Sequence, residues 1–278
     1  MEAFSVRVPA SISNLGPGFD CLGVALRLYN RITLTRGGQG SRLPVIVDEA
    51  ARLFFKQAAV RPFEFSCATA GDVPRARGLG SSASVRLGII HCLNRLAGEP
   101  LDRVALFHLC ARLEGHPDNA AASSFGGFTV ARADNVQRCD VSPRLKFVLL
   151  IPDFEVKTSA ARKILPSRIV RTKAVESCGN ACAITAAFVS RNYAALHGRF
   201  SDQFHQPFRA RLIPFLPRVI AAAEKAGALG AFLSGSGSTI AAVTLGSPEK
   251  IARAMLAATN AKARALITPA DNRGVSVR

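Results

Sequence analysis

A glycine- and serine-rich run, PRARGLGSSAS at residues 74–84, stands directly before the helix-forming stretch VRLGIIHCLNRLAG. From Ser81 onward the apolar residues recur at helical spacing, and Gly98 is the expected end of that helix. The first turn of a helix has unpaired N–H groups and the positive end of the helix dipole, so small residues there let a phosphate approach the backbone closely. The run indicates a phosphate-binding loop or a serine-capped helix start. It is not a Walker A loop, because GxxxxGK[ST] does not occur there.

Alternating apolar residues predict three strands before this run, in FSVRVPA (4–10), NRITLTR (30–36) and PFEFSCAT (62–69). After it we expect a helix from Asp102 to Gly115, a strand in SFGGFTVARA and a buried strand in KFVLLIP (146–152). The later helices are expected at 159–165, 174–198, 210–226 and 248–263, and the later strands at 231–235, 239–245 and 265–271. This order predicts an α+β fold, with the helices of the second half on one side of a sheet.

The net charge of +17, from 36 Lys and Arg against 19 Asp and Glu, predicts a surface that attracts anions. The basic residues are scattered, and the chain has no Trp and only two Tyr to stack bases, which disfavours specific nucleic-acid binding. Seven cysteines without paired C-x-x-C spacing indicate mostly buried thiols in a reducing compartment. No signal peptide and no apolar run of about 18 residues is visible. We therefore expect a cytoplasmic protein without a membrane partner.

Polar and charged residues gather at further turns of the chain. Asn14 to Gly18 reads as a turn, and Asp20 follows it. In EGHPDN, Glu114 is a candidate Mg²⁺ ligand that would also face substrate phosphates, whereas a hydrogen-bonded histidine is the simpler interpretation of His116. Arg162 and Arg209 are either surface residues or guanidiniums that bind a carboxylate in bidentate fashion.

Seven stretches in chain order resemble the GHMP small-molecule kinases and, within them, the homoserine kinase family. The resemblance covers nearly the whole chain. The stretches are VPASISNLGPGFD (8–20), PRARGLGSSAS (74–84), EGHPDN (114–119) with the following GGF, TSAARKILP (158–166), HQPFR (205–209), GAFLSGSGS (230–238) and DNRG (271–274).

This resemblance implies an N-terminal, ATP-binding domain of the ribosomal protein S5 domain 2-like type at 1–150 and a ferredoxin-like C-terminal domain at 151–278. ATP and substrate would meet between them. The implied reaction is phosphoryl transfer from Mg-ATP to the side-chain hydroxyl of L-homoserine, which gives O-phospho-L-homoserine in threonine biosynthesis. A homodimer is also implied.

The resemblance also implies roles for individual residues. Ser82 and Glu114 would bind Mg²⁺, and Asp20 would pair with the substrate ammonium. Arg162 and Arg209 would bind its carboxylate, while Asn14, His116 and Thr158 would complete the pocket. Asn119 would hydrogen-bond the reacting hydroxyl, and either Asp118 or a phosphate oxygen would take its proton. The residues implied around the ATP phosphates are Arg77, Gly78, Leu79, Gly80, Ser81, Ser82 and Ala83.

Three departures from the family pattern bear on specificity. Where the family continues D-N-x-A-P, this chain keeps Asp118 and Asn119 but follows them with Ala-Ala-Ala-Ser at 120–123, which we expect to alter the wall beside the acceptor hydroxyl. Val45, Ile46 and Val47 stand where the family has N-L-V, so an adenine-contacting amide is missing, and the region from Arg36 to Pro44 is short. Two alternatives therefore stay open: a GHMP kinase for a related hydroxy amino acid or small alcohol, and a basic RNA-binding protein that reuses the S5-like half.

Overall fold

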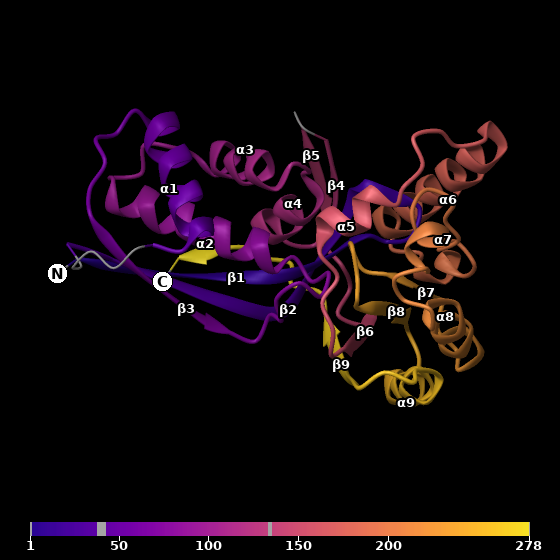
Figure 1. Cartoon of the computed structure of the whole chain (residues 1–278). Coiled ribbons are helices and arrows are strands. Elements are labelled where there is room, and N and C mark those ends of the chain that lie inside the picture. Colours follow the sequence, from indigo (N-terminus) through magenta and orange to yellow (C-terminus); the bar gives the residue numbers. More distant parts are fainter. Residues whose placement is uncertain (1, 38–42, 133–134, 278) are drawn as a thin grey trace.

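The protein is built on two antiparallel sheets, which lie side by side in the computed structural model (Figure 1). The model describes residues 2–37, 43–132 and 135–277. The first sheet has the order β10-β1-β2-β4-β5, with β3 paired to a further part of β2. Its strands are β1 (Ala3–Asn14), β2 (Gly18–Arg36), β3 (Phe65–Gly71), β4 (Phe128–Ala131), β5 (Val136–Cys139) and β10 (Ser276–Val277).

The first two strands form a hairpin that is longer than the sequence pattern predicts. The three expected strands are confirmed, but β1 continues to Asn14 and β2 already begins at Gly18, so the predicted turn joins them directly. The extra part of β2 is a nearly continuous apolar run because both of its faces are covered: Gly23 faces the segment 118–125, while Val24 and Leu26 lie in the core shared with the second sheet. This hairpin places Asn14 and Asp20 on opposite sides of one turn.

Four helices cover one face of the first sheet: α1 (Val45–Ala58), α2 (Ser81–Leu96), α3 (Arg103–Glu114) and α4 (Asp118–Phe125). The predicted limits of α2 and α3 are confirmed. The Asp102 side chain caps α3 by accepting from the Ala105 N–H, and Gly115 ends the helix with φ +78°. Helix α4 was not predicted, because its alanine and serine residues show no amphipathic period.

The second sheet has the order β7-β8-β6-β9, and its two faces pack against different partners. Val148 and Leu150 pack under the helices α8 (Leu216–Lys225) and α9 (Pro248–Ala258). Phe147 and Leu149 share a core with the first sheet and with Phe188 of α6 (Arg171–Val189). The expectation that all helices of this half lie on one side is therefore wrong for α6. The strands are β6 (Lys146–Pro152), β7 (Gly230–Leu233), β8 (Ile240–Thr244) and β9 (Ala263–Pro269).

Several predicted helix limits in this half are corrected. Helix α6 ends at Val189, and a 3₁₀ turn, η1 (Tyr193–Leu196), follows it. Helix α8 begins only at Leu216, beside a proline at its first turn, and α9 ends at Ala258 because Ala263 already pairs with β6. Alanine-rich stretches favour helix without marking where it stops, so tertiary pairing decides these ends. Two short helices complete the order, α5 (Thr158–Lys163) and α7 (Gln206–Arg209).

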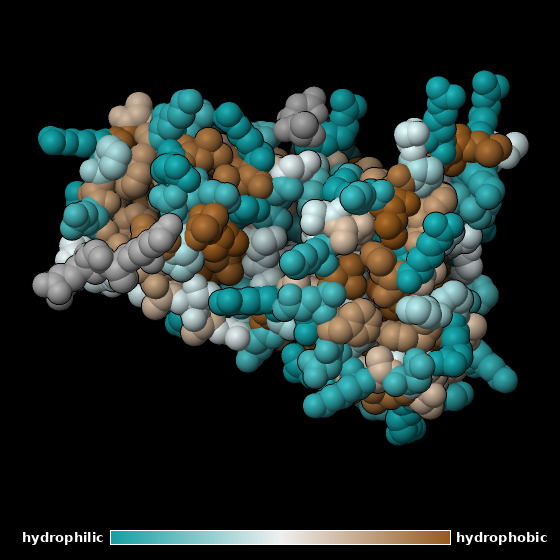
Figure 2. Space-filling model, in the orientation of Figure 1, coloured by the Kyte–Doolittle hydropathy of each residue, from teal (hydrophilic) through white to brown (hydrophobic). Residues whose placement is uncertain are grey.

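The two sheets share one apolar core, in which Phe128 of β4 stacks on Phe188 at a ring distance of 4.2 Å. The expected domain boundary at residue 150 falls inside β6, and the division of the chain into 1–150 and 151–278 stays a prediction. Hydrophilic side chains are spread over both halves of the visible face in Figure 2. None of the described helices has the length and apolarity needed to cross a membrane. All seven cysteines are free, but only Cys92 and Cys110 are buried.

Candidate active site

A cavity of about 440 Å³ lies where the hairpin turn, the start of α2 and the elements α4, α5 and α7 meet. It brings together most of the residues singled out from the sequence. Leu79 and Ala83 are exceptions, because their side chains are buried in the two cores and only their backbone is available to a ligand. The predicted residues that line the cavity are Asn14, Asp20, Arg77, Gly78, Gly80, Ser81, Ser82, Glu114, His116, Asp118, Asn119, Thr158, Arg162 and Arg209.

The glycines of the loop before α2 are required by close packing within the protein. Both have positive φ, +73° at Gly78 and +64° at Gly80. A Cβ on Gly78 would lie 2.1 Å from the Ser234 carbonyl oxygen, and one on Gly80 would lie 2.1 Å from Ser11 Oγ. Gly80 caps α2 without any side-chain hydrogen bond, so the serine-capped alternative is wrong. The N–H groups of the first turn have no partner within the helix, and Ser81 and Ser82 line the cavity.

Ser82 and Glu114 form an oxygen-rich pair at the cavity wall. Ser82 Oγ donates to Glu114 Oε2 at 2.7 Å, and Arg86 holds Oε1 of the same carboxylate at 2.5 Å. Burial alone would lower the pKa of Arg86, but Glu114 and Glu49 outweigh it and raise that pKa. A hydroxyl and a carboxylate oxygen are hard ligands of the kind that Mg²⁺ takes beside phosphate and water. The pair therefore fits the metal that the resemblance implies.

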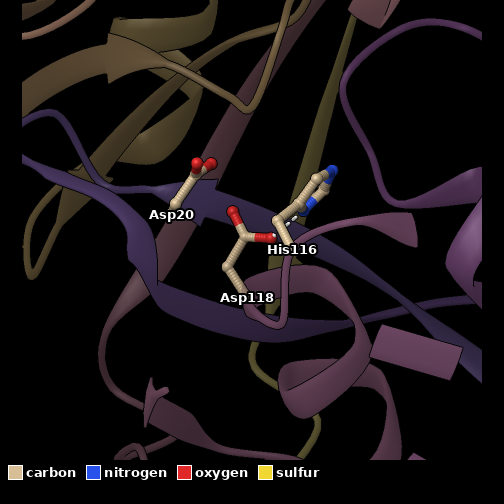
Figure 3. Close-up of side chains that lie close together, drawn as sticks. All are labelled: Asp20, His116 and Asp118. Atoms are coloured by element: carbon tan, nitrogen blue, oxygen red, sulfur yellow. Dashed lines mark hydrogen bonds and ion pairs between the residues drawn. The ribbon is translucent and has the colours of Figure 1, made fainter. Parts of the chain in front are cut away.

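His116 and Asp118 form a buried ion pair at the start of α4 (Figure 3). The His116 Nδ1 lies 2.6 Å from Asp118 Oδ1, which also accepts the Asn119 N–H at 2.7 Å. Burial opposes both charges, yet the hydrogen bond between the two raises the pKa of His116 and, with the backbone, lowers that of Asp118. One ligand atom each of Asp20, His116 and Asp118 lies within 4.8 Å of the others. Because Asp118 engages the His116 Nδ1 and the raised pKa favours a protonated ring, which cannot bind a metal, this group is a poor metal site.

The side-chain amide of Asn119 is held by two serines of β1. Ser11 Oγ donates to Asn119 Oδ1 at 2.9 Å, and Asn119 Nδ2 donates to Ser13 Oγ at 3.0 Å. Asn119 Nδ2 also donates to Asp118 Oδ1 at 3.4 Å, and because a carboxylate only accepts, this contact decides which end of the amide is the donor. Ser13 also lines the cavity and was missed in the sequence. Its two-residue spacing from Ser11, which puts both hydroxyls on one face of a strand, is the signal that predicts it.

Asp20 and Arg162 bind each other. The two guanidinium nitrogens NH1 and NH2 donate to Asp20 Oδ2 and Oδ1 at 3.0 and 2.7 Å. The sequence predicted separate roles for them at opposite ends of an amino acid, so this contact is new. The ring of Phe19 lies 5.5 Å from the Arg162 guanidinium and 5.3 Å from that of Arg209.

Arg209 is a buried guanidinium, only 2% exposed, at the same wall. It donates to the Gly235 carbonyl at 2.8 Å and to His205 Nδ1 at 3.3 Å. His205 Nε2 donates to the Gly16 carbonyl at 2.8 Å, and burial lowers the pKa of His205 to about 4, so the neutral ring accepts at Nδ1. Burial, together with Arg162, lowers the pKa of Arg209 to about 10. Within the described part of the chain, no carboxylate lies within 4.0 Å of this guanidinium.

The remaining predicted residues have mixed surroundings. The Arg77 guanidinium is engaged by the Pro152 carbonyl, Asp153 and Glu155. Thr158 Oγ1 lies 3.5 Å from Ser236 Oγ. Arg75 and Lys157 also line the cavity, and no sequence motif marks Lys157.

The two departures that we expected to change the cavity differ in their outcome. Ala120, Ala121 and Ala122 are fully buried in α4 and do not line the cavity, so the expected change in its wall is wrong. Ile46 and Val47 do line it, beside Pro44. The DNRG stretch lies outside the cavity, where Asp271 accepts from Tyr29 and from two backbone N–H groups.

Comparisons with known proteins agree with this geometry. The model of the GHMP kinases N terminal domain matches residues 45–127, and that of the GHMP kinases C terminal domain matches residues 186–261. The homoserine kinase of Caldicellulosiruptor bescii is 38% identical over 256 aligned positions, which cover 86% of this chain and 83% of that protein. The chain belongs to the homoserine kinase family.

Two further members of the family match at least 98% of the chain. The homoserine kinase of Caldicellulosiruptor saccharolyticus is 37% identical over 98% of this chain and 96% of its own length. The crystal structure of homoserine kinase from Cytophaga hutchinsonii is 27% identical and superposes with a TM-score of 0.89 over 100% of this chain and 98% of that one. The predicted α+β, two-domain GHMP kinase fold and the kinase class are confirmed.

Proposed function

We propose that this protein transfers the terminal phosphoryl group of ATP to the side-chain hydroxyl of L-homoserine, giving O-phospho-L-homoserine for threonine biosynthesis. The observation that carries the proposal is Arg209, a buried cation at the cavity wall without an anionic partner among the described residues. A buried unpaired charge is costly, so the site favours an anionic ligand. Arg162 offers a second guanidinium for a carboxylate, and Asp20 a carboxylate for an ammonium group.

The start of α2 supports binding of the ATP phosphates. Its free first-turn N–H groups and dipole favour negative charge, and the side chains of Arg75 and Lys157 add positive charge at the cavity. Ser82 and Glu114 would hold Mg²⁺, which when bound neutralises charge on the phosphates and fixes their orientation. Arg86 keeps the Glu114 carboxylate directed at this point.

The acceptor hydroxyl would be placed by Asn119, whose orientation Ser11 and Ser13 determine. Phosphoryl transfer depends mainly on positioning and charge neutralisation, so no strong base is needed. The lowered pKa of Asp118 makes it a weak base. The arrangement therefore favours a phosphate oxygen as the proton acceptor, with Asp118 keeping its charge beside His116.

The proposal extends to the setting of the enzyme. We infer a homodimer in the cytoplasm, and a chain divided near residue 150 into an ATP-binding half and a C-terminal half. These inferences rest on the family resemblance. Sedimentation of the purified chain tests the first of them.

The reaction is tested by measuring ADP release from Mg-ATP with L-homoserine, L-threonine, L-serine, mevalonate and shikimate at equal concentrations. We expect a strong preference for L-homoserine, with O-phospho-L-homoserine identified by mass spectrometry. Turnover of another compound in preference to homoserine would reassign the acceptor within the family. ATP binding without turnover of any of the five would reject the proposed substrate while leaving the kinase fold in place.

A further inference from the structure

The ion pair between Asp20 and Arg162 uses the atoms that the proposed substrate needs. Both carboxylate oxygens and two guanidinium nitrogens are engaged in it, and both side chains are about one-third exposed at the cavity. The partners come from separate elements, β2 and α5. A ligand carboxylate can occupy the same NH1–NH2 fork of Arg162, and a ligand ammonium can replace it on Asp20, only if this contact opens.

We infer that the Asp20–Arg162 pair is a latch which a zwitterion replaces by exchange, and which selects amino acids against alcohols that carry a single charge. The inference rests on the proposed function, because it takes Asp20 and Arg162 as the ammonium and carboxylate ligands. A zwitterion gives Asp20 a new cation and Arg162 a new anion. Every charge of the opened latch is then paired again.

A ligand with only a carboxylate supplies no new cation for Asp20. It can pair with Arg209 and leave the latch closed, or it can take Arg162 and strand Asp20, whose carboxylate lies within 4.8 Å of that of Asp118. Two carboxylates so close together disfavour each other when one loses its counterion. The latch therefore withholds Arg162 from a carboxylate that arrives without an ammonium group.

A ligand with only an ammonium group supplies no new anion for Arg162. It takes Asp20 and leaves Arg162 unpaired near Arg209, and these two cations already act on each other, since Arg162 contributes to the lowered pKa of Arg209. Phe19, which faces both guanidiniums, supplies no formal charge. The selection is therefore expected in both directions, and it needs no contact with the rest of the ligand.

Binding measurements on single-charge ligands test the latch directly. The ligands are L-homoserine, 4-hydroxybutanoate with the carboxylate alone and 3-aminopropan-1-ol with the ammonium alone. They are titrated by ligand-observed NMR and calorimetry into the full chain and into the variants Asp20→Asn and Arg162→Met. Asn is suited to position 20, where φ is +57° and the backbone N–H bonds Asn14 Oδ1, because Asn adopts this conformation readily.

Each variant is expected to bind L-homoserine more weakly and one of the single-charge ligands more tightly. Asp20→Asn lowers the affinity for L-homoserine by about tenfold or more. The same variant raises the affinity for 4-hydroxybutanoate, because Arg162 is already free. Arg162→Met weakens L-homoserine and tightens 3-aminopropan-1-ol. Binding that becomes measurable from an undetectable level counts as tightening. Asp140→Asn, which removes a carboxylate from the Arg138–Asp140 pair outside the cavity, leaves all three affinities unchanged.

Folded variants that bind the single-charge ligands no better than the unaltered chain would overturn the latch. Circular dichroism and thermal unfolding establish folding, and Arg162→Gln replaces Arg162→Met if the latter does not fold. Failure of the proposed function gives a different result, since L-homoserine then does not bind the unaltered chain. Tightening of 4-hydroxybutanoate by Asp20→Asn still reports on the latch in that case.

Discussion

Burial lowers the pKa of His91, a histidine of α2 that lies outside the active site. His91 of α2 is buried, its Nε2 has no hydrogen-bond partner, and burial together with Arg103 lowers its pKa from the usual 6.5 to about 4. Between these pH values the unfolded chain binds a proton at this position and the folded chain does not. The free energy of unfolding therefore falls as the pH is lowered through this range.

We predict that His91→Leu weakens this acid sensitivity. The shift corresponds to about 3 kcal/mol at most, developed from pH 6.5 down to pH 4. Urea unfolding at several pH values should show the variant gaining stability relative to the unaltered chain toward acid. His197→Leu, at an exposed histidine, is the control and should show no such trend. A parallel pH dependence in His91→Leu would contradict the prediction.

Arg209 is the residue whose loss should separate the two substrates. We predict that Arg209→Ala raises KM for L-homoserine by about tenfold or more and leaves KM for ATP nearly unchanged, because a carboxylate loses a buried charge-assisted contact. Steady-state kinetics with each substrate varied measures this. Arg211→Ala removes an exposed charge two residues away and serves as the control. Equal effects on both KM values would remove Arg209 from the carboxylate site.

At the scale of elements, the loop before α2 depends on how closely two segments approach. Gly78 and Gly98 flank the same helix, and both have positive φ, +73° and +83°. A Cβ at Gly78 meets the Ser234 carbonyl oxygen at 2.1 Å, whereas one at Gly98 has no neighbour within 4 Å. The two glycines therefore share a conformational requirement and differ in packing.

We predict that Gly98→Ala costs about 1 kcal/mol of unfolding free energy, which is the penalty for the left-handed conformation alone. Gly78→Ala should cost clearly more and should also raise KM for ATP, because the loop must move away from the Ser234 carbonyl. Chemical denaturation and kinetics of both variants measure the difference. Equal costs would mean that the loop relaxes without strain.

The first turn of α2 and the last residue of α3 meet at the Ser82–Glu114 hydrogen bond. We predict that Ser82→Ala weakens Mg²⁺ binding in the presence of a non-hydrolysable ATP analogue severalfold, because one hard oxygen ligand is lost. Calorimetry of Mg²⁺ binding measures this independently of turnover. An unchanged affinity would give Ser82 only the role of a hydrogen-bond donor to Glu114.

The elements also show what a sequence can predict. Asp102 and Gly115 are local signals, and the helix between them was predicted correctly. Nearly every site residue that the seven stretches implied lies at the cavity, because these stretches resemble those of one kinase family. The Asp20–Arg162 contact and the burial of Ala120 were not predictable, because they depend on how β2, α4 and α5 pack in space. Ser13 is an intermediate case. The sequence predicts which face of its strand it occupies, but not that it contacts Asn119.

For the whole molecule, the shared core couples the two sheets. Phe188 of α6 stacks on Phe128 of the first sheet, and the same core includes Phe147 and Phe232 of the second. The core-facing side of each sheet is therefore buried only when the other sheet packs against it. The chain should therefore unfold in one cooperative transition.

We predict that Phe188→Ala lowers the free energy of unfolding by about 3–5 kcal/mol, the usual cost of removing a buried aromatic ring. Hydrogen exchange should then quicken in both β4 and β6. Val189→Ala, at a neighbour that is 66% exposed, is the matched control and should stay within about 0.5 kcal/mol. Faster exchange in one sheet alone would show that the halves unfold separately.

The pairing of β10 with β1 joins Val277 and Ser276 to Val6 and Arg7. The ribosome makes Val6 well before Val277, so the first sheet is completed only after all the helices and strands between them have been made. Throughout that interval the hydrogen-bonding edge of β1 is open to any other nascent strand. The growing polypeptide is thus exposed to mispairing along β1 until residues 276 and 277 have been made and can pair with it.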